Sequence, residues 1–182
     1  MKNKSIEVVI VGAIRTPIGT FKGSLRNMRS DELGSVVIKE VLNKSKFSNE
    51  EIDEVIMGQV LTAGAGQNPA RQAAIKAGIP NSKPAHIINQ VCGSGLRAVI
   101  SGYQSIKLGE SKNVISGGQE NMSLAPHSIL YREKKNFSED KLLDTMINDG
   151  LMMHLIIIIW ALRQKMLQKN LIYQGKNKMS LL

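Results

Sequence analysis

The stretch IINQVCGSGLRA, residues 87–98, changes its periodicity in the middle. Its first five residues are mostly apolar and β-branched, which predicts a buried strand over 87–91. Apolar residues then recur at helical spacing over 96–106, and Gly109 marks the end of the predicted helix. The only cysteine of the chain, Cys92, is therefore expected on a glycine-rich turn where a strand becomes a helix.

This position favours a chemical role for Cys92. A thiol at a helix N-terminus faces unpaired backbone N–H groups and the positive end of the helix dipole, which both favour the thiolate. Gly93 and Gly95 leave room for a substrate to approach the backbone. The alternative interpretation is an ordinary buried cysteine that acts as a small hydrophobic residue.

A nucleophile also needs a base and an oxyanion site. His86 shares a face of the same strand with Cys92, but it lies about 20 Å away at the rise of a β-strand. We therefore expect His86 to be structural. His127 lies in a later segment, and nothing in the sequence places it near Cys92.

The composition is that of an ordinary globular protein. The 182 residues are 42% hydrophobic and 21% charged. A single cysteine excludes an internal disulfide and, without histidines at ligand spacing, a cysteine-based zinc site, so we expect no metal. No apolar stretch of signal-peptide length precedes the first predicted strand, and we expect a cytoplasmic protein.

The net charge of +9 does not indicate a nucleic-acid partner. Five basic residues and no acidic residue follow Asp149, so more than half of the excess lies in the last part of the chain. The basic residues do not form a helical stripe, and aromatic residues make up only 4% of the chain. We therefore expect no binding to nucleic acid.

The remaining pattern predicts an α/β fold. The expected elements are a strand over 7–13, a helix capped by Ser30 or Asp31, a capping box over 48–51, a strand over 55–61, a helix capped by Asn68 with Pro69 at its first position, and a strand that begins with 113–116 and ends at Gly117-Gly118. Strands that alternate with helices indicate a layered domain with a parallel sheet and right-handed crossovers. Cys92 would then lie at the carboxyl edge of the sheet, where such folds bind ligands. Residues 122–148 are expected to be a loop-rich insertion.

A second function class uses the same turn. Gly93-x-Gly95-x-x-Ala98 matches the dinucleotide-binding fingerprint, which would indicate an oxidoreductase. The turn, however, follows the third predicted strand and not the first. The acidic residue expected about twenty positions later would be Glu120, which does not close a strand.

Four ordered motifs together resemble the thiolase family of acyl-CoA acyltransferases. They are IVGAIRTPIG at 10–19, GQV at 58–60 with GAGQNPARQA at 64–73, NQVCGSGLRA at 89–98, and GGQENMS at 117–123 with APH at 125–127. Gln119 departs from the methionine that is commoner in the family. The resemblance runs from about residue 6 to Leu151.

The resemblance implies a fold, a chemistry and partners. It implies the N-terminal, mostly parallel α/β domain of a thiolase over 1–121, incomplete, and the start of the loop domain over 122–151. Cys92 would be the nucleophile that attacks an acyl-CoA thioester and carries the acyl group, in Claisen condensation or thiolysis. Acetyl-CoA or another acyl-CoA would be the substrate, with no further cofactor. Family members are dimers or dimers of dimers, with the segment matching 67–71 near the subunit contact.

The later half of a thiolase supplies a histidine that activates the cysteine, a second cysteine and an oxyanion site. The sequence contains no second cysteine and no Gly-His-Pro. We therefore expect a truncated chain without activity. The alternative is a non-catalytic α/β fragment that at most pairs with other thiolase subunits.

From Met152 the pattern of the family stops, and we interpret 152–182 as an aberrant tail. Its apolar run 155–162 is too short to span a bilayer, so we expect no membrane insertion. The codons of Met152-Met153-His154, read two bases later, encode Asp-Ala, and suitable codons for the following residues continue a thiolase-like segment. This suggests a frameshift near codon 151 and a pseudogene product.

Overall fold

The computed structural model describes residues 7–132, 138–153 and 158–159. The chain divides into two compact units, Met1–Pro126 and His127–Leu182. The first unit contains, in chain order, α1 (Ser30–Ser45), the 3₁₀ turn Asn49–Glu51, β1 (Glu54–Gly58), α2 (Pro69–Lys76), β2 (Ala85–Ile88), α3 (Ser94–Leu108), β3 (Val114–Gly118) and the 3₁₀ turn Met122–Leu124.

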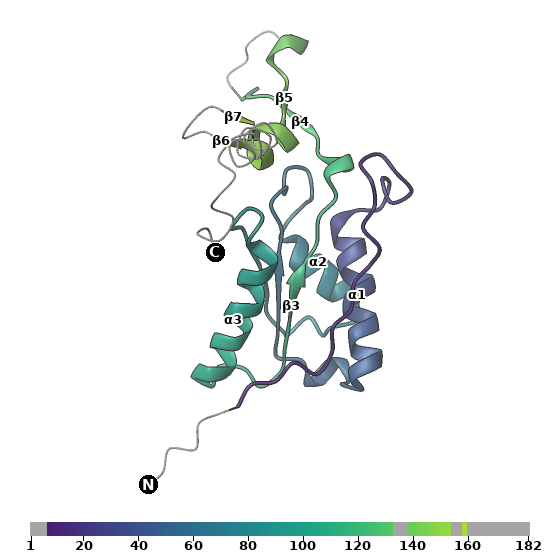
Figure 1. The fold of residues 1–182 in the computed structure, drawn as a ribbon, viewed down its shortest axis with the longest axis vertical. Coiled ribbons are helices and arrows are strands. Elements are labelled where there is room, and N and C mark those ends of the chain that lie inside the picture. The colour runs from purple at the N-terminus through teal and green to yellow at the C-terminus, as the bar shows by residue number, and fades with distance from the viewer. Residues whose placement is uncertain (1–6, 133–137, 154–157, 160–182) are drawn as a thin grey trace, which may run out of the picture. The chain divides into compact units, whose positions relative to one another are not determined.

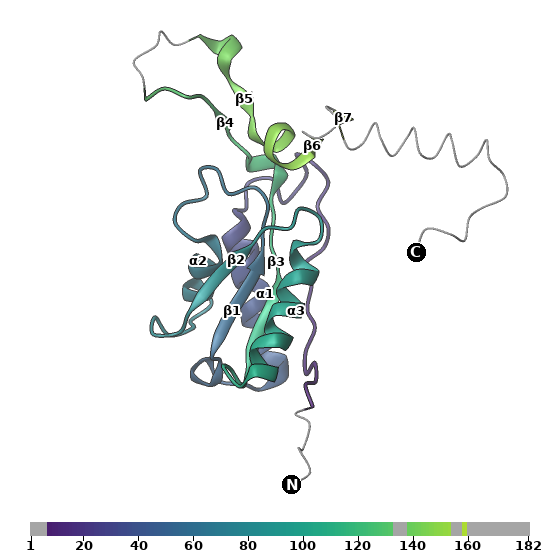
Figure 2. The ribbon, with the colours of Figure 1, turned by 90° about the vertical axis from the view of Figure 1, so that its left-hand side faces the viewer.

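The three strands form one parallel sheet in the order β2-β1-β3. Val55 pairs with Ala85 on one side and with Ile115 on the other. Helices α1 and α2 lie on one face of this sheet and α3 lies on the other, as Figures 1 and 2 show. The predicted layered α/β domain with parallel strands is confirmed.

The core lies on the α1 and α2 side of the sheet. Val55 and Met57 of β1 are buried there against apolar residues of both helices and the C-cap of α2, namely Ile38, Leu42, Ala70, Ala73, Ala74 and Ala77. The alanines of α2 let that helix pack closely on the strand. Ile56 is also buried, and the alternation of side chains along a strand directs it to the α3 side.

A buried carboxylate joins α1 to α2. The side chain of Asp31 is fully buried, and it pairs with Arg29 at 2.9 Å and with Lys76 of α2 at 2.5 Å. Burial raises the pKa of Asp31, but the hydrogen bonds and charges of Lys76 and Arg29 outweigh it and hold that pKa below its ordinary value. The prediction that Ser30 or Asp31 caps α1 is wrong, because Arg29 occupies the N-cap and both residues are buried inside the first turn.

The predicted strand over 7–13 is also wrong. This segment forms no strand, and Ile10 is 80% exposed. Gly12 lies against Val41 of α1. A run of apolar residues becomes a strand only where another strand offers its backbone groups, and none of the described strands pairs with it.

The other predicted strands exist, but their ends differ. Strand β1 ends at Gly58, three residues before the predicted end, because the N–H groups of Val60 and Leu61 bond to a side chain and not to a strand. Strand β2 ends at Ile88, where the turn to α3 begins. Strand β3 ends at Gly118, where the sequence predicted its end, and it starts one residue later than predicted, at Val114. The capping box at Ser48 and the Asn68 cap of α2 are confirmed.

The second unit, which begins at His127, contains only short elements in its described residues. They are β4 (His127–Ser128), the 3₁₀ turn Glu139–Lys141, β5 (Leu143–Asp144), the π-helical turn Met146–Leu151, β6 (Met152–Met153) and β7 (Ile158–Ile159). Strands β4 and β5 pair antiparallel, as do β6 and β7. Apart from Met152, Met153 and β7, the tail 152–182 lies outside the described residues, and so does most of its apolar run.

The approach of β1 to α3 can be tested at Gly58. A Cβ atom at this position would collide with the backbone of Ser94 and Gly95. We expect Gly58→Ala to lower the free energy of unfolding by about 1–3 kcal/mol, measured by urea denaturation, because backbone must move to admit the methyl group. Gly117→Ala is the control, since its nearest neighbour would be the Met57 sulfur at 3.8 Å. Equal stability of the two variants would contradict this packing.

Candidate active site

Cys92 lies on the turn between β2 and α3, which is the position that the sequence predicted. Its side chain is exposed. The turn closes on itself through backbone bonds from Gly93 N–H to the Gln90 carbonyl at 3.0 Å and from Ser94 N–H to the Val91 carbonyl at 3.1 Å. The buried Ser94 hydroxyl accepts a bond from Gln90 N–H at 2.8 Å and donates to the Val91 carbonyl at 2.6 Å. The thiol is thus presented to solvent by a tightly bonded turn.

The residue before Cys92 has an unusual backbone conformation. Val91 has φ 49°, in the left-handed region that β-branched residues avoid. This conformation costs about 1–2 kcal/mol relative to an ordinary one. The reversal it produces ends β2 and directs the chain into α3 within a few residues.

Glycines bring the sheet close to the start of α3. Gly58, at the end of β1, faces the backbone of Ser94 and Gly95, and a Cβ at Gly118 would lie 3.4 Å from the Gly58 carbonyl oxygen and from Gly95 Cα. We refer to Gly58, Gly95 and Gly118 as the glycine junction. No side chain caps the first turn of α3. The N-terminus of this 15-residue helix therefore meets the strand ends next to Cys92, and its positive dipole end has no side-chain cap.

The described histidines have other partners. His86 Nδ1 lies 3.2 Å from Glu54 Oε1, which agrees with the expected structural role. His127, in the second unit, lies 4.0 Å from Asp144 through its Nε2 atom. The structure assigns neither of them to Cys92 as a base.

Glu120, the acidic residue that the dinucleotide interpretation would need, is held by the segment after β1. Its Oε2 atom accepts hydrogen bonds from Val60 N–H at 2.8 Å and Leu61 N–H at 3.2 Å, while Oε1 is buried without a hydrogen-bond partner. Burial raises the pKa of Glu120, and the backbone N–H bonds from Val60, Leu61 and Asn121 oppose this only in part. A carboxylate held in this way does not serve as the ribose ligand that the dinucleotide interpretation requires.

The residues before Glu120 and Val60, Gln119 and Gln59, form a buried pair of amide side chains. Gln119 Nε2 donates to Gln59 Oε1 at 2.8 Å, and Gln59 Nε2 donates to Ser30 Oγ at 3.0 Å and to the Leu61 carbonyl at 2.8 Å. Gln119 is the position where the sequence departs from the commoner methionine. Its amide thus joins β3 to the segment after β1 and to α1.

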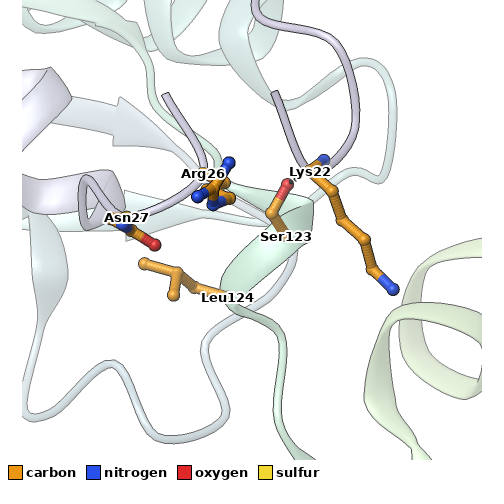
Figure 3. Close-up of a pocket in the computed structure, with 5 residues that line it drawn as sticks. All are labelled: Lys22, Arg26, Asn27, Ser123 and Leu124. Carbon is orange, nitrogen blue, oxygen red and sulfur yellow. Dashed lines mark hydrogen bonds between the residues drawn. The ribbon is translucent and has the colours of Figure 1, made fainter. Parts of the chain in front are cut away.

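An open pocket of about 440 Å³ lies elsewhere in the first unit, lined by Lys22, Arg26, Asn27, Ser123 and Leu124. Figure 3 shows that the Lys22 side chain runs away from Arg26, and its ammonium lies 5.5 Å from the Phe21 ring centroid. The Ser123 hydroxyl accepts a bond from Lys22 N–H at 2.9 Å. The two cations therefore do not converge on one point, and we assign no ligand to this pocket.

A family model described as the N-terminal domain of thiolase matches residues 8–170. The chain belongs to the thiolase family. The match continues past Leu151, where we expected the resemblance to end. It confirms the family indicated by the motifs around Cys92 and selects it over the dinucleotide-binding interpretation.

Individual relatives of known type support the same family assignment. The chain is 56% identical over 146 residues to an acetyl-CoA acetyltransferase of Cupriavidus necator and 51% identical over 151 residues to a cytosolic acetyl-CoA acetyltransferase of the mouse. A crystal structure of a thiolase from Ascaris suum, in complex with coenzyme A, superposes with a TM-score of 0.82 at 38% identity and covers 88% of this chain. The chain spans 37–38% of the length of the two relatives and 42% of the Ascaris chain.

The described residues contain neither a helix that could cross a membrane nor a group of metal-ligating side chains. No helix within 7–132, 138–153 or 158–159 is both long and apolar enough to cross a membrane. Across the same ranges, no group of three or more histidine, cysteine, aspartate or glutamate side chains is arranged to hold a metal ion.

The raised pKa of Glu120 predicts a pH-dependent stability. Between the unfolded value near 4.5 and the higher folded value, the folded chain binds more protons, so stability falls as the pH rises through this window. Glu120→Gln keeps an oxygen for the two N–H groups and carries no charge. We expect it to lose this pH dependence, measured by urea denaturation at pH values from 4 to about 7.

The control is Glu50→Gln, which changes an exposed glutamate. It should follow the wild-type profile. A constant stability difference between Glu120→Gln and wild type at every pH would mean that Glu120 titrates as it does in the unfolded chain.

Proposed function

We propose that the chain is the acyl-accepting part of a thiolase-type acyl-CoA acyltransferase, with Cys92 as the nucleophile. The observation that carries this proposal is the exposed sole cysteine on a strained strand-to-helix turn, within the segment that matches the family. Relatives named acetyl-CoA acetyltransferase support acetyl-CoA, or another acyl-CoA, as the substrate. No further cofactor is part of the proposal.

The step that Cys92 performs is a thioester exchange. The thiolate sulfur attacks the carbonyl carbon, a new carbon–sulfur bond forms, and the bond to the sulfur of coenzyme A breaks. The acyl group is then on Cys92, and coenzyme A leaves as a thiolate that takes up a proton. The uncapped N-terminus of α3 stabilises negative charge beside the attacking sulfur.

Acylation of the purified chain tests this role. We expect incubation with acetyl-CoA to place one acetyl group on Cys92, measured by intact mass and peptide mapping. Because the folded turn presents the thiol at a helix start, the rate should exceed that of the chain unfolded in urea by on the order of tenfold. Cys92→Ser removes the only thiol and should remain unmodified there. Equal rates in the folded and unfolded chain would refute the role.

Complete turnover is a separate expectation. A thiolase also uses a second cysteine, whereas this sequence contains a single cysteine, Cys92. We expect no Cys92-dependent thiolysis of acetoacetyl-CoA by the purified chain. Residues that act as a unit in catalysis lose many decades of rate when partners are missing. A thiolysis rate that disappears in Cys92→Ser would show that the chain is a complete catalyst.

Two further properties belong to the proposal. The family resemblance supports a homodimer or homotetramer, with the segment 67–71 near the subunit contact. The names of the mouse and rat relatives, which are cytosolic acetyl-CoA acetyltransferases, support a cytoplasmic location.

We also propose that the tail results from a frameshift near codon 151, which would make the chain a truncated thiolase or the product of a pseudogene. The overlapping reading of the codons for Met152-Met153-His154 supports it. The family match that continues to residue 170 in the chain's own frame is the opposing observation. Resequencing the locus decides between them: we expect an overlapping thiolase frame after codon 151, and a locus without one rules the frameshift out.

A further inference from the structure

The side chain of Asn89 bonds in two directions from the end of β2. Its Oδ1 atom accepts a hydrogen bond from Val91 N–H at 3.0 Å, and its Nδ2 atom donates to the Val60 carbonyl at 3.5 Å. Asn89 is itself exposed. It therefore contributes little to the core, and its bonds act on the turn that follows.

Both polar backbone groups of Val91 are held by side chains from opposite ends of the turn. Asn89, just after β2, binds the N–H, and Ser94, the first residue of α3, binds the carbonyl with its hydroxyl at 2.6 Å. Hydrogen bonds from both sides thus hold the backbone of Val91 at its positive φ of 49°.

Without these hydrogen bonds, a β-branched residue such as Val91 favours negative φ. A change in the φ angle of Val91 would alter the direction of the Cys92 side chain relative to the start of α3. The Ser94 hydroxyl binds the carbonyl of Val91 but not its N–H, which is bound by the Asn89 side chain.

We propose that Asn89 is a positioning residue for Cys92: its carboxamide keeps Val91 left-handed and so keeps the thiol at the N-terminus of α3. This inference rests on the proposed function of Cys92 as the acyl acceptor. Asn89 acts through the backbone of Val91 and does not itself take part in the acyl transfer.

The other end of the Asn89 side chain is anchored as well. Its partner is the carbonyl of Val60, and the Val60 N–H is bound by the Glu120 carboxylate at 2.8 Å. The Gln59 N–H donates to the Ile88 carbonyl at 3.1 Å, which ties the same segment to the end of β2. The segment after β1 thus provides a fixed support for Asn89.

The location of the thiol can be measured without enzymatic turnover. Because Cys92 is the only cysteine, alkylation reports on this thiol alone. The rate with anionic iodoacetate divided by the rate with neutral iodoacetamide, at the same pH, cancels the fraction of thiolate. A thiol beside the positive end of α3 favours the anionic reagent, so this ratio measures its proximity to the helix start.

We expect Asn89→Ala to lower the ratio about two- to fivefold at low ionic strength, the range that loss of a helix-dipole interaction covers. Asn89→Ser should retain most of the wild-type ratio, because a serine hydroxyl can accept a bond from the N–H two residues on. Val91→Gly introduced into Asn89→Ala should restore it, since glycine adopts positive φ without side-chain support.

Gln104→Ala, which removes an exposed amide elsewhere on α3, is the matched control and should leave the ratio unchanged. Circular dichroism confirms that each variant is folded. An unchanged ratio in folded Asn89→Ala, or no recovery in either rescue variant, would overturn the positioning role. Failure of acetyl-CoA to acylate the wild type would instead overturn the proposed function, and the alkylation ratio would still be measurable.

Discussion

The glycine junction sets how closely the sheet and helix α3 approach one another. Gly58, Gly95 and Gly118 come from β1, α3 and the end of β3, and each presents only backbone to the others. A side chain at Gly58 would separate the layers, because its Cβ would collide with the backbone of Ser94 and Gly95. The junction therefore fixes the start of α3 against the strand ends, and the turn that carries Cys92 has to close over that fixed distance.

A left-handed residue makes this closure possible. The chain leaves β2 at Ile88 and begins α3 at Ser94, so it reverses within five residues. Val91 supplies the reversal, and the side chains on either side of it bind its N–H and carbonyl groups. The strain at Val91 is thus balanced by local hydrogen bonds, and the residue that follows is the exposed Cys92.

Much of this arrangement could be predicted from the sequence, because it depends on local periodicity. The change from alternating to helical spacing placed Cys92 on a strand-to-helix turn, and the cap at Asn68 follows from its own position before a proline. The roles of Glu120 and Gln119 could not be predicted, since their partners lie about sixty residues earlier in the chain. The bond from Asn89 to Val91 joins residues two apart, and an asparagine two positions before a valine was the one available signal.

The segment 7–13 shows the limit of hydropathy. Its apolar run indicates what the segment prefers to contact, whereas strand formation depends on a partner from a distant part of the chain. In the structure Val9, Ile10 and Val11 are each more than 60% exposed. An exposed, apolar segment of this kind is a template for pairing between molecules, with low charge and no proline within the run. At high concentration, then, the chain's solubility depends on whether a strand covers this segment before another copy of the same segment does.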